Sequence, residues 1–151
     1  LGDVYKRQAS TALKNNLTTW LNSVKMVSDS VDILDANILN IAIKFDIHAQ
    51  SEVNKSSLYS NVRDKIFEEL TEIPPEIGQD LYLTEIFKIL KDIDEILDVV
   101  NVSLEVRSAG NYSPYSVSID SLMSLDGRVL QIPEDTIWEV KYITDISGII
   151  R

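Results

Sequence analysis

The feature that most constrains this chain is a large apolar residue at every second position over 39–47. The apolar residues of this stretch are Leu39, Ile41, Ile43, Phe45 and Ile47. The polar residues on the other side are Asn40, Lys44, Asp46 and, just beyond, His48. Because successive side chains of a strand point to opposite faces, this period predicts a β-strand. One face of the strand is expected in a core, and the other is expected to face water or a partner.

A helix is predicted ahead of this strand, over residues 11–27, with Ser10 or Thr11 as its N-terminal cap. Its apolar residues recur at three- and four-residue steps: Leu13, Leu17, Trp20, Leu21, Val24 and Val27. One side of this helix is therefore apolar and has to pack against something. Between the helix and the long strand, Val31 and Ile33 alternate with polar residues and predict a short strand.

Helices and strands also follow one another after residue 50. A second helix begins at Asn54 or Ser56 and ends before two consecutive prolines, which cannot continue a helix. A third, short helix capped by Thr84 precedes an alternating strand over 100–106. The early strands join by a short turn and the later ones join through helices. The predicted fold class is therefore α+β, with helices on one face of a mixed, mainly antiparallel sheet.

The chain is predicted to divide into three parts. Within residues 1–8, the stretch DVYKRQ looks like the translation of a transposon end used as a sequencing adaptor, so this segment is expected to be non-native. Residues 9–107 are expected to form the α+β domain. Residues 108–151 begin with turn residues and contain three short alternating stretches, which predict a small β-rich C-terminal unit. Such a unit needs neighbouring surface to be stable.

Composition excludes several kinds of chemistry. The chain has no cysteine and a single histidine, so it cannot form disulfides or thiolate zinc sites. Its net charge of −10 repels phosphate backbones and anionic membranes. No apolar run approaches the ~20 residues of a membrane span. We therefore expect no cofactor, no bound metal, and neither a nucleic acid nor a membrane as partner.

Carboxylates are the remaining candidates for catalysis, and they form two clusters. The clusters are Glu68, Glu69 and Glu72, and Asp92, Asp94, Glu95 and Asp98. Such groups can supply an acid–base pair or a hard-cation site, but both clusters lie between apolar positions, as the solvated side of a helix does. The sequence also contains no phosphate-binding glycine loop and no nucleophile motif. We predict no catalytic residue, and we do not expect an enzyme.

Aromatic residues gather in the C-terminal unit. They are Tyr112, Tyr115, Trp138 and Tyr142. A unit of this size is too small to bury all of them, and protein interfaces are rich in tyrosine and tryptophan. Tyr112, Tyr115 and Trp138 are therefore predicted to be interface residues.

The order of these patterns resembles one known family. After the first helix come SDSVDILD at 28–35, the alternating strand, and a helix opened by NKS at 54–56. Near the end come GNYSPYS at 110–116, IWEVKY at 137–142 and DISG at 145–148. Over residues 9–151, this order is similar to the C-terminal region of the baseplate wedge subunit of T-even-like contractile-tailed phages, which is related to the baseplate J-like family.

The resemblance implies a structural protein. Members of the family form part of the baseplate wedge, pair with copies of themselves and join wedges into a ring around the tail hub. The implied partners are a second copy and other wedge proteins, and the implied location is the virion tail baseplate after assembly in the host cytoplasm. Two alternatives stay open: a carboxylate-based, tail-associated hydrolase, and a receptor-binding tail module whose aromatic unit exposes a concave patch.

Overall fold

The computed structural model describes residues 8–26 and 31–151, which belong to two compact units, Leu1–Ala36 and Asn37–Arg151. The first unit contains α1 (Thr11–Val24). The Ser10 hydroxyl accepts a hydrogen bond from the Leu13 amide at 3.2 Å, so the predicted start of the helix and its cap are confirmed. The helix ends at Val24, short of the predicted end at Val27, which lies outside the described residues. The short strand predicted around Val31 and Ile33 is wrong: residues 31–36 are extended but pair with no other strand.

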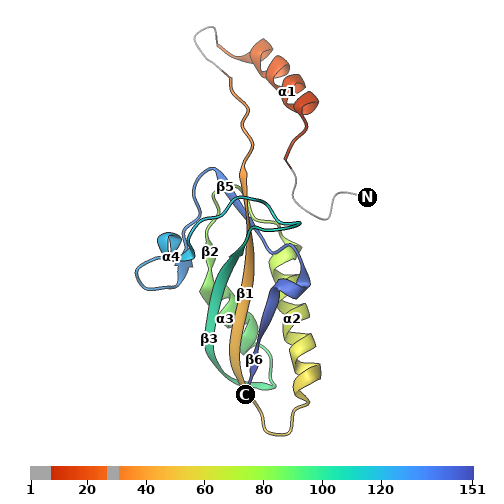
Figure 1. The fold of residues 1–151 in the computed structure, drawn as a ribbon, viewed down its shortest axis with the longest axis vertical. Coiled ribbons are helices and arrows are strands. Elements are labelled where there is room, and N and C mark those ends of the chain that lie inside the picture. Colours follow the sequence, from red (N-terminus) through yellow and green to blue (C-terminus); the bar gives the residue numbers. More distant parts are fainter. Residues whose placement is uncertain (1–7, 27–30) are drawn as a thin grey trace. The chain divides into compact units, whose positions relative to one another are not determined.

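The second unit is built around β1 (Asn37–Ala49), which confirms the strand predicted from the alternation. β3 (Ile96–Arg107) pairs with one edge of β1 in antiparallel orientation. β5 (Thr136–Glu139) and then β6 (Ile146–Ile150) pair with its other edge, both in parallel orientation. Figure 1 shows β1 in the middle, with β3 on one side and β6 on the other. The sheet is therefore mixed, and the fold is α+β as predicted.

Two helices cover one face of this sheet. α2 (Lys55–Glu72) begins after Asn54, whose side chain accepts hydrogen bonds from the two following serine amides. α3 (Leu83–Lys91) follows a two-residue strand, β2 (Leu81–Tyr82), without a Thr84 cap, so that predicted start is wrong. The helices bury Leu58, Val62, Ile66, Leu70, Leu83, Ile86 and Leu90 in one core with the apolar residues of β1. These burials confirm which face of β1 is apolar.

Residues 108–151 complete the sheet of the second unit. Because β5 and β6 pair with β1, the compact units divide after Ala36 and not after residue 107, where the sequence predicts a boundary. β6 is a strand that the alternation of the sequence does not predict. The physical reason for the difference is that pairing with a distant strand leaves little trace in a short local pattern.

The middle of this C-terminal stretch also differs from the prediction. The alternating residues Tyr115, Val117 and Ile119 form no strand, and Ile119 is the first residue of α4 (Ile119–Leu122). Their side chains are partly buried against the core, which explains the apolar alternation without any strand pairing. A two-stranded sheet forms instead from β2 and β4 (Val129–Leu130).

Candidate functional site

The three predicted interface residues make contacts within the chain. Trp138 lies on β5 and is 5% exposed, so its indole belongs to the core of the second unit. Tyr115 is partly buried and packs against the same core. In this arrangement Trp138 has almost no surface to offer to a partner.

Tyr112 belongs to a partly buried polar network. Its hydroxyl donates a hydrogen bond to Asp145 Oδ1 at 2.6 Å, and the Tyr142 amide donates to Oδ2 of the same carboxylate at 3.3 Å. The rings of Tyr112 and Tyr142 meet edge to face, with their centroids 5.6 Å apart. The hydrogen bond to the Asp145 carboxylate and burial raise the pKa of Tyr112 to about 12. Tyr112 therefore ties the turn after β3 to the segment between β5 and β6.

This network predicts a pH effect that a tyrosine substitution removes. The pKa of Tyr112 is about 12 in the folded state against an ordinary value of 10.0, so the network stabilises the fold fully below pH 10.0. This stabilisation is lost as the pH rises toward 12. In the Tyr112→Phe variant, a near-ultraviolet absorbance titration should lack the tyrosine that ionises at the highest pH. The free energy of unfolding of this variant should also depend less on pH in the alkaline range. Tyr82→Phe, at an exposed position, is the control. A titration in which both variants lose the same step would contradict this prediction.

Members of the two carboxylate clusters meet in a hollow between α2 and α3. The hollow has a volume of about 340 Å³ and is lined by Lys65, Glu69, Leu70, Glu85, Lys88, Ile89 and Asp92. Glu69 and Asp92 come from the two predicted clusters, and this is where a carboxylate-based hydrolase would have its acid and base. Two lysines share the hollow, so its charge is mixed. Among the described residues, no group of three or more metal-binding side chains forms.

The uncovered part of the sheet face carries ion pairs within the chain. Lys44 Nζ lies 2.7 Å from Glu105 Oε1, and Arg151 binds both oxygens of Asp46 at 3.0 and 3.1 Å. The hydrogen bond with Lys44 holds the pKa of the Glu105 carboxyl below its usual value. This surface is polar and internally paired, as a solvated sheet face is.

An uncovered apolar surface lies on α1. No residue of α1 is buried. Its side chains are exposed by 49% at Leu13, 43% at Leu17, 61% at Trp20 and 62% at Val24. We call these four residues the α1 seam, because they follow one another at steps of four, three and four along one side of the helix. The sequence predicts this apolar side of the helix, but the predicted interface residues lie in the C-terminal unit instead.

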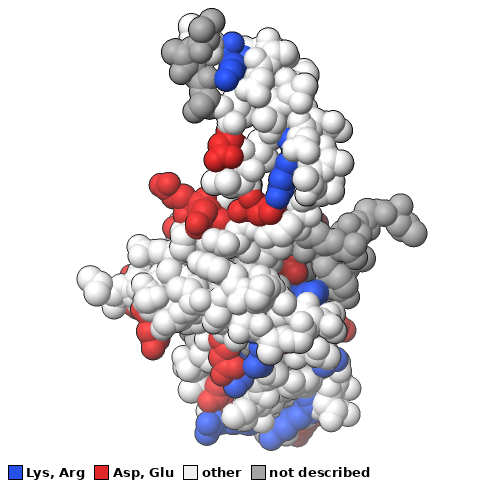
Figure 2. Space-filling view, turned by 45° about the horizontal axis from the view of Figure 1, so that its top comes forward, with Lys and Arg blue, Asp and Glu red and all other residues white. Residues whose placement is uncertain are grey.

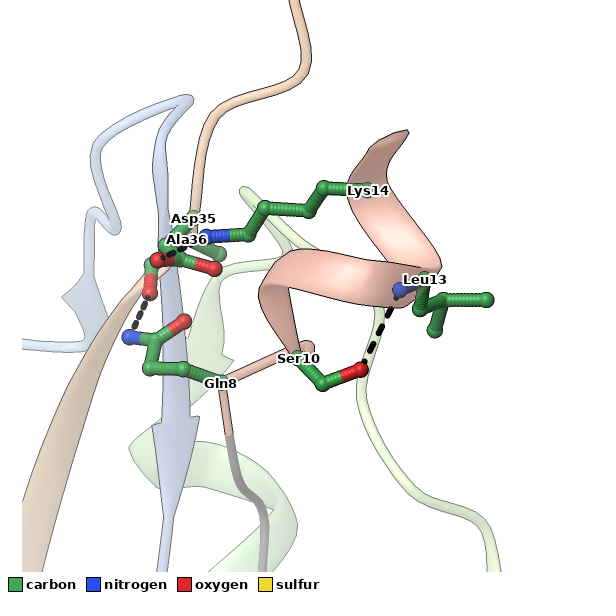
Figure 3. A network of polar contacts seen from close by, with 6 residues as sticks. All are labelled: Gln8, Ser10, Leu13, Lys14, Asp35 and Ala36. Carbon is green, nitrogen blue, oxygen red and sulfur yellow. Dashed lines mark hydrogen bonds and ion pairs between the residues drawn. The ribbon is translucent and has the colours of Figure 1, made fainter. Parts of the chain in front are cut away.

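The polar contacts of the first unit lie away from the α1 seam. Lys14 Nζ lies 2.5 Å from Asp35 Oδ2, and Gln8 Nε2 donates a hydrogen bond to the Ala36 carbonyl at 2.6 Å. Figure 3 shows Lys14 reaching toward Asp35, while the Leu13 side chain points away from this pair. The start of α1 is thus held by its polar side, and the seam is left uncovered within the described part of this unit.

The two units differ in charge. Residues 1–36 contain four acidic and four basic residues, so the net charge of −10 belongs to residues 37–151. α1 itself contains Lys14 and no acidic residue. In Figure 2 the surface around α1 is mostly white, which marks uncharged residues. The apolar seam therefore lies on the electrically neutral part of an acidic protein.

No family model and no curated protein matches the chain. Among the described residues, none of the helices is long and apolar enough to cross a membrane. The resemblance to the baseplate wedge subunit stays a prediction, and the function has to be argued from the surfaces of the molecule.

Proposed function

We propose that this chain is a structural component of a phage tail baseplate wedge and contributes contacts that join wedges into a ring around the tail hub. The observation that carries the proposal is the α1 seam, an apolar helix side that no described residue of its own unit covers. A helix of 14 residues is marginal in water by itself. α1 therefore gains stability when its seam is buried against another molecule.

The strength of such a contact suits a repeated assembly. Full burial of a large apolar side chain contributes about 1.5–3 kcal/mol, and the four seam side chains are about half exposed. Their burial is worth on the order of 3–6 kcal/mol before the entropy of association is subtracted. One contact of this size is weak, but a closed ring repeats it and all the copies support one another.

Two further features support the assignment to a baseplate. The patterns at 28–35, 110–116 and 137–142 occur in the order that the family resemblance implies. The acidic second unit keeps free subunits apart and selects partners with basic surfaces. These two effects of charge suit a protein whose subunits stay separate until they meet their assembly partners.

The test is the oligomeric state of the chain, measured by light scattering after size exclusion over a concentration series. We expect reversible self-association that strengthens with concentration. Trp20→Glu should weaken it by about 10-fold or more, because burying the new carboxylate costs at least ~1.4 kcal/mol. Asn22→Glu adds the same charge to the opposite side of the same helix and is the matched control.

The outcomes separate the α1 seam from a general charge effect. Equal weakening by Trp20→Glu and Asn22→Glu would show that added charge, and not the seam, controls association. A chain that stays monomeric at every concentration and binds no baseplate wedge protein would contradict the proposed function.

A further inference from the structure

We infer that the outer edge of β6 binds an extended, acidic segment of another protein, which joins the sheet as an additional strand. We call this surface the β6 edge, and it consists of Gly148, Ile150 and the α2 residues Lys55, Ser56, Tyr59 and Ser60. It shares no residue with the α1 seam, so the inference goes beyond the proposed function and does not rest on it. Unpaired backbone groups, an unguarded strand and the charge of a neighbouring hollow carry it.

The outer backbone groups of β6 have no partner in the described part of the chain. Arg151, which follows β6, donates its N–H to the Ile47 carbonyl at 2.8 Å and accepts from the Ala49 amide at 3.0 Å. Backbone direction alternates along a strand, so Gly148 and Ile150 direct their N–H and C=O groups away from β1. β1 is the only described strand that pairs with β6, and no described backbone group bonds to these outer groups. An extended backbone satisfies such a row of groups.

β6 lacks the features that guard many sheet edges. Bulges, prolines and charged residues commonly keep an edge strand from pairing with another chain. At the opposite edge of the sheet, the register between β3 and β1 is interrupted twice, and β3 carries Asp98, Glu105 and Arg107. β6 keeps an unbroken five-residue register with β1, and its sequence ISGII contains no charged residue and no proline. The β6 edge is therefore the one open to a further strand.

A hollow beside β6 offers side-chain contacts to the added strand. It has a volume of about 470 Å³ and is lined by Lys55, Ser56, Tyr59, Ser60 and Ile150. Figure 1 shows β6 between β1 and α2. The Tyr59 ring packs against Phe45, with the ring centroids 5.8 Å apart, so this wall of the hollow is fixed by the core. A strand paired with β6 directs every second side chain toward the helices, and hence toward this hollow.

Charge selects an acidic segment. Lys55 is the only charged residue among those that line the hollow, and it forms no ion pair with a described residue. The hollow also lies at the N-terminal end of α2, where the dipole of an 18-residue helix favours negative charge. β6 of a second copy does not supply this charge, because ISGII contains no carboxylate.

The extended residues 31–36 of this chain do not reach the β6 edge of the same chain. They lead directly into Asn37, so they extend at most about 22 Å from it. Gly148 is paired with Phe45, which lies eight residues further along β1. Eight strand residues span about 26 Å. The added strand therefore has to come from another molecule.

A synthetic peptide tests the inference on the full chain. The probe is a blocked heptapeptide in which threonine and valine alternate between two terminal aspartates. When it is added to about 1 mM, amide hydrogen exchange measured by nuclear magnetic resonance should slow roughly 5-fold or more at Gly148 and Ile150. The amides of Ser147 and Ile149 face β1 and are the internal reference. A probe with two lysines in place of the aspartates should bind a few-fold more weakly.

Methylated probes separate strand pairing from side-chain contact. Methylation of the peptide nitrogens that donate to β6 removes these donors and should abolish the slower exchange. Methylation of the intervening nitrogens, which point away from β6, should leave it in place. If both methylated probes bind equally well, the hollow takes side chains without strand pairing, and the inference is overturned.

Two variants of one residue test the edge from the side of the protein. Ile150→Pro removes an N–H that points away from β1 and leaves the bonds between β6 and β1 in place. Ile150→Ala removes most of the same side chain but keeps this N–H. The proline variant should weaken probe binding about 10-fold or more, and the alanine variant only a few-fold. Equal weakening would contradict strand pairing, and the methylated probes give the same decision if the proline variant does not fold.

The remaining outcomes identify other occupants. Exchange that does not slow with the probe would overturn the inference. Slow exchange at Gly148 and Ile150 in the dilute free chain would show that the chain covers its own edge, and slowing that grows with protein concentration would show a second copy there; either result overturns it. Trp20→Glu should leave probe binding unchanged, so failure at the β6 edge leaves the proposed function standing.

Discussion

Gly148→Ala should destabilise the second unit by about 3 kcal/mol, the upper end of the usual cost of overpacking. Gly148 lies in β6, directly beside Phe45 of β1 in the parallel register. A Cβ atom at this position would overlap the carbonyl oxygen and the ring of Phe45. The ring cannot move aside easily, because Phe45 is buried and packs against Tyr59, with the ring centroids 5.8 Å apart. The strands β1 and β6 would have to separate.

Urea denaturation measures the predicted loss, and hydrogen exchange of the β6 amides shows whether that strand detaches first. Gly110→Ala is the control. Gly110 has a φ of +68°, which strains an alanine, but no atom lies near its Cβ position. Gly110→Ala should lower the free energy of unfolding by only about 1 kcal/mol, because it strains the backbone conformation and nothing else. If both variants lose the same free energy of unfolding, the close contact with Phe45 does not explain the glycine in β6.

The sequence predicts β1 well and β6 not at all, and the reason is physical. In β1 every second residue from Leu39 to Ile47 is large and apolar, and this pattern identifies the face that the helices cover. β6 is a five-residue strand whose sequence, ISGII, is apolar at both parities and interrupted by glycine. Its place in the sheet depends on a strand about one hundred residues earlier, and no local pattern encodes that pairing.

The interface prediction shows a related limit. Trp138 and the seam residue Trp20 are both large aromatic side chains at apolar positions, and a sequence does not distinguish a core aromatic residue from an interface one. Only the structure separates them, because it places Trp138 in the core and leaves Trp20 61% exposed. The four-three-four spacing of the α1 seam can be read in the sequence, but its exposure among the described residues of its own unit cannot.

Asn40→Ala should destabilise the second unit by about 2 kcal/mol, because it breaks a buried hydrogen-bonding position. The alternation places Asn40 on the polar face of β1, where the sequence predicts exposure to water or a partner. The side chain is instead 2% exposed. Its Oδ1 accepts a hydrogen bond from the Ser113 amide at 2.7 Å, and its Nδ2 donates to Glu139 Oε1 at 3.4 Å.

Asn40 therefore joins three segments: β1, the turn after β3 and the end of β5. Alanine would leave the Ser113 amide without this acceptor, so residues 108–118 should open more often, and proteolysis within them should become faster. Lys44→Ala is the matched control, because Lys44 lies on the same strand and face but is exposed and ion-paired with Glu105. It should change the unfolding midpoint much less. Equal effects would mean that Asn40 acts as an ordinary surface residue, and that the turn is held chiefly by the hydrogen bond between Tyr112 and Asp145.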